Sequence, residues 1–174
     1  MFVISVMKKE DISEALALIE ALYLEIRNQT GSGAGVERYD GNSWRSQLEK
    51  SITLQGVEVF LARFSEHTGA FGIVIIEIRQ TKEGILGYIP IAYVSPARRR
   101  QGVLTRLDEA AAAYCDRFDI ARIRLSVLHC NVEANVAWKR IGYKETEQSG
   151  MSATLEKRIS GMGSDRSGPL PETL

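Results

Sequence analysis

The chain has 174 residues, 44% of them hydrophobic, which is enough to bury a core without disulfide bonds or a structural metal. Its 22 basic and 22 acidic side chains cancel, and this balance argues against general nucleic-acid binding, for which a basic excess is expected. The first residues lack the pattern of an export signal, and no apolar run is long enough to cross a membrane, so we expect a cytoplasmic protein without a membrane partner. The two cysteines lack the spacing of a metal site, so we expect no bound metal.

The chain is predicted to begin with a strand and a helix. Residues 2–7 alternate in part between apolar and polar side chains, which is typical of a strand. Asp11 can then cap an amphipathic helix, whose apolar side chains recur at three- and four-residue steps from Ile12 to Ile26. A polar, glycine-rich loop over 28–41 could be a lid, a binding loop or simply mobile, and it leads into a short helix over 43–54.

Three strands in succession are predicted next. Residues 57–61, 71–78 and 85–94 are rich in β-branched and aromatic side chains, and short turns join them into an antiparallel meander. Pro90 lies within the third strand and has no N–H to donate to a neighbour. The strand therefore needs either a bulge or an unpaired side at that residue.

The stretch from Gly87 to Phe118 reads as strand, tight turn and amphipathic helix. A helix that begins near Gln101 leaves its first N–H groups without intrahelical partners, and its dipole adds partial positive charge there. Gly102 allows close approach of a ligand. Full positive charges come from Arg98, Arg99, Arg100 and Arg106. We expect a phosphate or pyrophosphate site, with a merely solvated arginine run as the alternative; neither a P-loop nor a dinucleotide-binding glycine pattern is present.

A strand over 123–128, a helix over 133–140 and a hairpin of 143–147 with 152–158 complete the prediction. The crossover helix makes the strands 85–94 and 123–128 parallel, and ligands bind where the carboxyl ends of such strands part. We thus expect a site between Val94 and Leu128. The composition then shifts to Gly, Ser and Pro, so we expect one domain over 1–159 and a flexible polar tail over 160–174.

Two motifs connect these elements to a known family. Residues 94–103, VSPARRRQGV, resemble motif A of the GCN5-related N-acetyltransferases (GNAT family), whose turn reads R/Q-x-x-G-x-G/A. Arg99 and Gly102 occupy the first two fixed positions. Leu104 occupies the third, where the family prefers Gly or Ala, so the start of the helix could be displaced relative to coenzyme A.

Residues 129–143, HCNVEANVAWKRIGY, are similar to motif B of the same family. Asn131 and Ala134 match its N-x-x-A, and Arg140 to Tyr143 match its K-x-G-F/Y ending. The motifs occur in the family's order and separation, and the resemblance extends over about 2–158. It implies an α/β (α+β) fold with a mixed, mostly antiparallel twisted sheet of about seven strands and about four flanking helices, in which a splayed strand pair holds acetyl-CoA.

The resemblance also implies the residues that bind acetyl-CoA, the acetyl donor. The pyrophosphate would sit on the amides of 101–105 beside an arginine, and the pantetheine arm would pair with 92–94. The implied binding residues are Ala92, Tyr93, Val94, Arg99, Arg100, Gln101, Gly102, Val103, Leu104, Thr105 and Asn131. No metal is implied.

The catalytic acid departs from the family. The family usually has a Tyr four residues beyond the motif B alanine, and here that residue is Trp138, whose indole N–H is a donor and not a practical acid. Trp138 could be a plain wall of the pocket, and Tyr143, Cys130 or water could replace the acid. Candidates for the base are Glu77, Glu58 and His129, with a chain of water molecules as the alternative. Our candidate catalytic residues are Tyr143, Glu77 and Trp138.

The resemblance therefore implies an enzyme that moves an acetyl group from acetyl-CoA to a primary amine by direct attack. A small molecule is the first choice of acceptor: an amino acid, a polyamine, or an amino sugar such as an aminoglycoside. A protein N-terminus or lysine is the second choice, and a non-catalytic acyl-CoA-binding module is the alternative outside enzymes. We expect no nucleic-acid partner and keep a homodimer open.

Overall fold

The computed structural model describes residues 1–31, 39–65 and 68–159. Half of the predicted loop (32–38 of 28–41) and all of the predicted tail (160–174) lie outside the described residues. In chain order the elements are β1 (Val3–Val6), η1 (Lys9–Asp11), α1 (Ile12–Thr30), α2 (Gly41–Ser51), β2 (Val57–Arg63), β3 (Gly72–Thr81), β4 (Gly84–Val94), η2 (Pro96–Arg98), α3 (Val103–Asp116), β5 (Arg122–Leu128), α4 (Val132–Arg140), β6 (Lys144–Ser149) and β7 (Ser152–Arg158). Each strand and α-helix expected from the sequence is present, with somewhat different ends.

The strands form one sheet. Across the described ranges it has seven strands in the order β1-β2-β3-β4-β5-β7-β6. Neighbours are antiparallel except β4 and β5, which are parallel because α3 connects them as a crossover. Together with the four α-helices of the same ranges, this arrangement confirms the predicted mixed, mostly antiparallel sheet flanked by helices.

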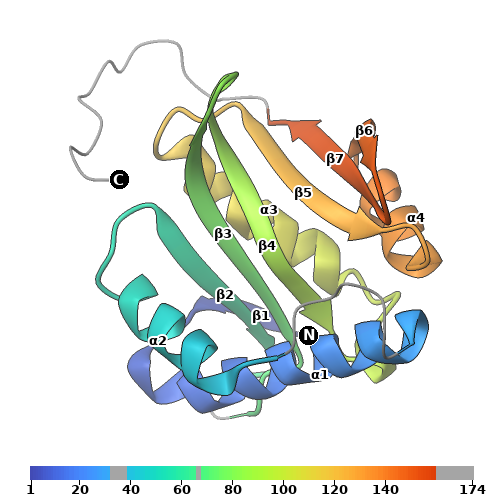
Figure 1. Ribbon diagram of the computed structural model, residues 1–174. Helices are drawn as coiled ribbons and strands as arrows, with labels where there is room; N and C mark the ends of the chain where they lie inside the picture. The colour runs from blue at the N-terminus through green and yellow to red at the C-terminus, as the bar shows by residue number, and fades with distance from the viewer. Residues whose placement is uncertain (32–38, 66–67, 160–174) are drawn as a thin grey trace.

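Helices cover both faces of the sheet (Figure 1). One apolar core lies between the sheet and α1 with α2, and includes Leu16, Ile19 and Leu48. The other lies between the sheet and α3 with α4, and includes Leu107 and Trp138. The sheet is thus held between two layers of helices. Within the described residues, none of these helices has both the length and the apolar content needed to span a bilayer.

The irregularity that Pro90 predicted is present in β4. Its pairing with β3 shifts register between Ile75 and Glu77, so β4 has one residue more than β3 over Ile89–Pro90. This bulge confirms the sequence argument, because a residue without an N–H is accommodated where the ladder is interrupted.

Two glycines allow α3 to lie close against the sheet. A Cβ atom on Gly87 would lie 2.5 Å from the Sγ atom of Cys115, and one on Gly72 would lie 3.2 Å from a methyl carbon of Val103. Neither residue can carry a side chain without displacing its neighbour. The position of α3 relative to β3 and β4 therefore depends on glycine at both places.

Two aspartates near helix starts have different roles. Asp40 caps α2, because its Oδ1 atom accepts the N–H of Asn42 at 3.0 Å. Asp11, predicted to cap α1, does not cap it: its carboxylate accepts the N–H of Lys8 and forms an ion pair with the buried Arg63 at 3.1 Å. The prediction was wrong because the long-range partner on β2 determines where this carboxylate lies.

Candidate active site

The two parallel strands part toward their carboxyl ends. The last paired residues are Ile89 of β4 and Leu125 of β5. β4 nevertheless continues to Val94, and β5 continues to Leu128. The ladder ends where β4 is bulged, so the peptide groups of β4 beyond the bulge lose their neighbour on the β5 side. The sequence placed a ligand site at this end of the strand pair.

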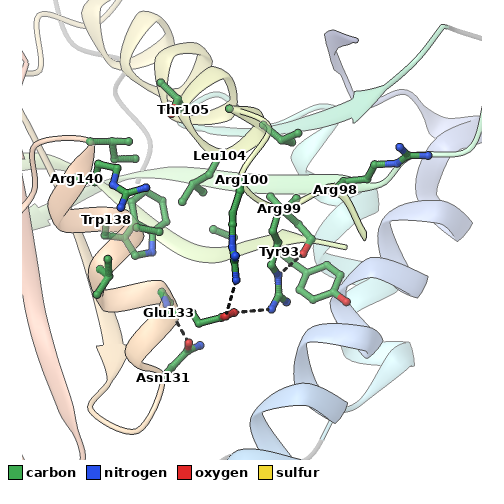
Figure 2. A pocket seen from close by; sticks show the side chains of 18 of the residues that line it. Tyr93, Arg98, Arg99, Arg100, Leu104, Thr105, Asn131, Glu133, Trp138 and Arg140 are labelled. Carbon is green, nitrogen blue, oxygen red and sulfur yellow. Dashed lines mark hydrogen bonds and ion pairs between the residues drawn. The ribbon is translucent and has the colours of Figure 1, made fainter. Parts of the chain in front are cut away.

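A pocket with a cavity volume of about 640 Å³ opens there (Figure 2). Its walls are the end of β4, the turn and first residues of α3, and α4, and α1 adds two side chains. The predicted residues that line it are Ala92, Tyr93, Val94, Arg99, Arg100, Gly102, Val103, Leu104, Thr105, Asn131 and Trp138. The predicted residues Gln101, Glu77 and Tyr143 are not part of the lining.

The start of α3 forms one wall. The helix begins at Val103 rather than near Gln101, and its N-cap Gly102 has a φ of 78°, which glycine adopts without strain. Among the described residues no side chain caps this end, and the N–H of Arg106 bonds the carbonyl of Gly102 at 3.1 Å. The amides just before Arg106 therefore have no helical partner and belong to residues that line the pocket. Gln101 is exposed, and its side-chain amide donates to the carbonyl of Ala97.

Arg99 is held by three protein partners. Its Nε–H donates to the carbonyl of Val94 at 3.1 Å, its Nη2 to Glu25 at 2.5 Å, and its Nη1 to Glu133 at 3.2 Å. Burial opposes its charge, but the hydrogen bond and the negative charge of Glu25 outweigh burial and raise the pKa of Arg99. The resemblance implied Arg99 or Arg100 as the charge partner of a pyrophosphate, and β4, α1 and α4 already engage the guanidinium group of Arg99.

The other two arginines of the turn differ from Arg99. The side chain of Arg100 is 88% exposed, and its contact with Glu133 is long, at 3.7 Å. Arg98 lies over the ring of Phe64, 4.7 Å from its centroid. Figure 2 shows Arg99 and Arg100 both directed toward Glu133. Of the three, Arg100 is the one that a ligand anion could engage with least rearrangement.

Trp138 forms the wall that α4 contributes. Its side chain is nearly buried, and its ring meets the ring of Tyr143 edge-on at 5.0 Å. Trp138 occupies the place where the motif of the resembled family has Tyr. At that place the pocket therefore has a large apolar surface and a single N–H donor, with no ionisable hydroxyl.

Tyr143 was proposed as a substitute acid, and the structure does not bring it to the pocket. It is 2% exposed, and its hydroxyl donates to the buried carboxylate of Asp108 at 2.8 Å, which Lys157 also contacts. Burial and the neighbouring Asp108 hold the pKa of Tyr143 well above its ordinary value. Its hydroxyl proton is thus held in a buried hydrogen bond away from the pocket, and Tyr143 is not a candidate acid.

Glu77, the predicted base, also lies elsewhere. It pairs with Arg79 at 2.6 Å on β3. Because β3 runs antiparallel to β4, Glu77 lies beside the first half of β4, and the pocket lies at the other end. The alternatives Glu58, His129 and Cys130 are also outside the lining. Within the described residues, no predicted carboxylate or imidazole reaches the pocket.

Asn131 and Tyr93 line the pocket as predicted, but each also has a partner in the protein. The Oδ1 atom of Asn131 accepts the N–H of Ala134 at 3.1 Å and so caps α4. The phenol of Tyr93 is mostly buried, and burial, with the nearby charge of Glu25, raises the pKa of Tyr93. Tyr93 therefore stays neutral across the physiological pH range.

The contribution of α1 to the pocket was not expected from the sequence. Leu22 and Glu25 line the pocket. A signal was available: with Ala15 and Leu18 they recur at three- and four-residue steps, so they continue one side of the buried face of α1. Glu133 of α4, which was read only as part of motif B, is the second carboxylate of the lining.

Comparison with known proteins gives structural matches alone. No family model and no curated protein sequence matches the chain. An acetyltransferase of the GNAT family from Staphylococcus aureus Mu50 superposes with a TM-score of 0.74 at 14% sequence identity, over 92% of this chain and 100% of its own. The PaiA N-acetyltransferase from Thermoplasma acidophilum, in complex with coenzyme A, gives 0.70 at 17%, over 91% and 99%.

A third match is the ribosomal-protein-S18-alanine N-acetyltransferase from Escherichia coli, with a TM-score of 0.64 at 15% identity, over 97% of this chain and 100% of its own. Structural similarity at this level of sequence identity establishes a shared fold, but it does not establish a shared reaction or substrate. The chain has the fold of the GNAT acetyltransferases, with a pocket at the open end of its splayed strand pair.

Proposed function

We propose that the protein transfers an acetyl group from acetyl-CoA to a primary amine. The observation that carries this proposal is the pocket itself, which combines the uncapped start of α3, the end of β4 beyond its ladder with β5, and a wall from α4. The fold of the structural neighbours supports the same reading, and the PaiA N-acetyltransferase among them is in complex with coenzyme A.

The residues present fit a molecule with a diphosphate group and an amide-rich arm. The amides of the first turn of α3 suit phosphate oxygens, and Arg100 adds an exposed positive charge beside them. The peptide groups from Ala92 to Val94 suit the amides of a pantetheine arm. Acetyl-CoA has both parts and, when bound, would supply the acetyl group from its thioester.

The chain's own groups would act mainly by position. A backbone N–H near Tyr93 or Val94 would donate to the acetyl oxygen and stabilise the negative charge that develops there, a contribution of about 2–4 kcal/mol. With Trp138 in place of a hydroxyl and none of the predicted bases in the lining, water would accept the proton that the attacking amine loses and would protonate the departing sulfur. A thiolate is a fair leaving group, so the lost acid slows the reaction by a factor of about a hundred rather than preventing it.

We propose a small amine as the acceptor before a protein. Glu25 and Glu133 are two carboxylates of the pocket lining, and the ammonium form of a small amine could compete with Arg99 for them. The ribosomal-protein-S18-alanine N-acetyltransferase acts, by its name, on a protein, so an N-terminal alanine is the second acceptor to test. Peptides that begin with alanine belong in the same panel as amino acids, polyamines and aminoglycosides.

The test begins with thermal unfolding in acetyl-CoA, followed by thiol release with the amine panel. At a ligand concentration near 100 Kd, binding should add about 2.7 kcal/mol to the stability of the wild type. Gly102→Trp should lose most of this gain because its ring would occupy the pocket. Gly102→Ala is the matched control, since it introduces the same left-handed strain without bulk.

The second candidate function is a module that binds acyl-CoA without transferring it. Trp138 favours it, because this side chain fills the family's acid position with a group that cannot act as an acid. Stabilisation by acetyl-CoA with no thiol release on any amine would select this candidate. No stabilisation at all would remove both. The cytoplasmic location and the homodimer stay predictions, the latter to be checked by sedimentation.

A further inference from the structure

Arg99 connects three elements whose residues line the pocket. It follows β4 in the chain, contacts α1 through Glu25 and α4 through Glu133, and holds the carbonyl of Val94, the last residue of β4. Arg100 adds a longer contact of 3.7 Å between the same turn and Glu133 of α4. Figure 2 shows the guanidinium group of Arg99 between Tyr93 and Glu133.

The contacts differ in strength, and the strongest is the one with α1. The side chains of Arg99 and Glu25 are 29% and 25% exposed, so solvent screens this charge pair only partly. Glu133 is 68% exposed, and its contact counts for less. The guanidinium group is therefore fixed chiefly between Glu25 and the Val94 carbonyl. A Lys could not donate to both acceptors in the same geometry, because it lacks the planar fork of N–H groups.

We infer that Arg99 is a positioning residue, which sets the orientation of the end of β4, and that Arg100 is the residue of the turn that meets the donor's phosphates. The inference rests on the proposed function. A phosphate could engage Arg99 only by displacing carboxylates that are already hydrogen-bonded to it. Arg100 is exposed and has one long contact, so it is available at no such cost.

The effect of losing each arginine should depend differently on whether the acetyl donor has phosphates. If Arg99 orients β4, its loss harms any donor that lies along β4, whether or not that donor has phosphates. If Arg100 meets the phosphates, its loss harms only donors that have them. The same substitution, Arg→Gln, can be made at both residues and removes one charge in each case.

The experiment compares Arg99→Gln and Arg100→Gln in two assays. Acetyl transfer is measured with acetyl-CoA and with S-acetylpantetheine, which lacks phosphates. Binding is measured with adenosine 3′,5′-bisphosphate, which lacks the pantetheine arm. For Arg99→Gln we expect kcat/KM to fall about ten- to a hundredfold with both donors, as for a misplaced binding surface, while the Kd of the bisphosphate stays within about twofold. For Arg100→Gln we expect the Kd of the bisphosphate and the KM for acetyl-CoA to rise about fivefold or more, with no change for S-acetylpantetheine.

A coupling measurement separates positioning from a general loss of folding. Glu25→Gln should reproduce much of the deficit of Arg99→Gln, and the double variant should be no worse than Arg99→Gln alone, because the contact between Arg99 and Glu25 is missing in all three variants. A merely unfolded fraction would instead weaken bisphosphate binding in proportion. An Arg99→Gln deficit that disappears with S-acetylpantetheine would overturn the inference, since Arg99 would then be the phosphate partner.

The outcomes for the two proposals stay distinct because binding is measured apart from turnover. A wild type that binds acetyl-CoA and the bisphosphate but transfers no acetyl group ends the transferase proposal, and the bisphosphate affinities of the two variants still decide which arginine meets phosphate. A wild type that binds neither ligand overturns both proposals.

Discussion

Trp138 limits the acid chemistry that the pocket can provide. We expect Trp138→Tyr to place a phenol hydroxyl on the wall that α4 contributes and to raise kcat by about tenfold or more, since a positioned acid contributes a factor of about 10²–10⁴ where proton transfer limits the rate. The measurement is kcat across pH, with a new fall at high pH as the phenol ionises. Trp138→Phe is the control, because it removes the indole without adding a hydroxyl. Equal rates for both variants would show that protonation of the sulfur does not limit turnover.

Tyr143 is expected to matter for stability and not for transfer. In Tyr143→Phe the buried carboxylate of Asp108 loses the hydroxyl donor at 2.8 Å and keeps only Lys157, which should lower the free energy of unfolding by about 1–3 kcal/mol. Urea unfolding measures the change. Tyr88→Phe is the matched control, because its exposed hydroxyl makes only a 3.5 Å contact with Ser126. If Tyr143→Phe instead abolished kcat while its stability was unchanged, Tyr143 would return as the candidate acid.

Single residues also show where sequence reasoning reached its limit. The two motifs predicted most of the pocket lining, because short stretches of chain contribute it directly. They could not predict the role of Arg99, because its partners Glu25 and Glu133 lie 74 and 34 residues away along the chain. The prediction of Glu77 as the base was wrong for a related reason. Alternation along a strand indicates which face of the sheet a side chain occupies, but not which end of the sheet forms the pocket.

At the scale of elements, the contact between α3 and β4 is the most demanding. We expect Gly87→Ala to cost about 1–3 kcal/mol of stability, because the added Cβ would lie 2.5 Å from the sulfur of Cys115 and α3 would have to shift. Calorimetric unfolding measures the loss. Since α3 starts at the pocket, the Kd for acetyl-CoA should rise as well.

The partner substitution provides the control for this contact. Cys115→Ala removes the sulfur, so the double variant Gly87→Ala, Cys115→Ala should be more stable than the sum of the two single losses implies. Strict additivity would show that the cost at Gly87 comes from the backbone and not from the contact with α3.

The elements themselves followed well from the sequence because periodicity reports burial, and burial decides which face of each helix and strand packs. Pro90 predicted either a bulge or an unpaired side, since a missing N–H is a local property, and the structure has the bulge. The ends of elements were less accurate. α3 starts at Val103 because Gly102 adopts a left-handed conformation, a property of the folded turn that the arginine run before it does not reveal.

For the whole molecule, the two cysteines offer a measure of unfolding. Burial, with a smaller effect from Asp108, raises the pKa of the Cys115 thiol to about 12, and its side chain is inaccessible, whereas Cys130 is exposed. At pH 8 we expect an alkylating reagent to modify Cys130 quickly and Cys115 only through opening of the fold. Mass spectrometry of each site over time gives both rates.

The free energy of unfolding should depend on pH through Cys115, with a definite sign. The folded state keeps the Cys115 proton up to about pH 12, while the unfolded chain loses it near the ordinary value of 9.0, so stability should fall as pH rises above that value. Cys115→Ala should flatten this fall. Modification of both cysteines at the same rate in the native protein would contradict the packing of α3 against the sheet.

The parting of β4 from β5 also bears on how such a protein can change over evolutionary time. The groups it exposes, together with those at the start of α3, are peptide N–H and C=O groups, which every amino acid except proline supplies alike. Substitution can replace most side chains around them without removing a single donor or acceptor. Chains built this way can therefore differ at most positions while the shape that places those peptide groups is kept, which agrees with a shared fold at 14% sequence identity.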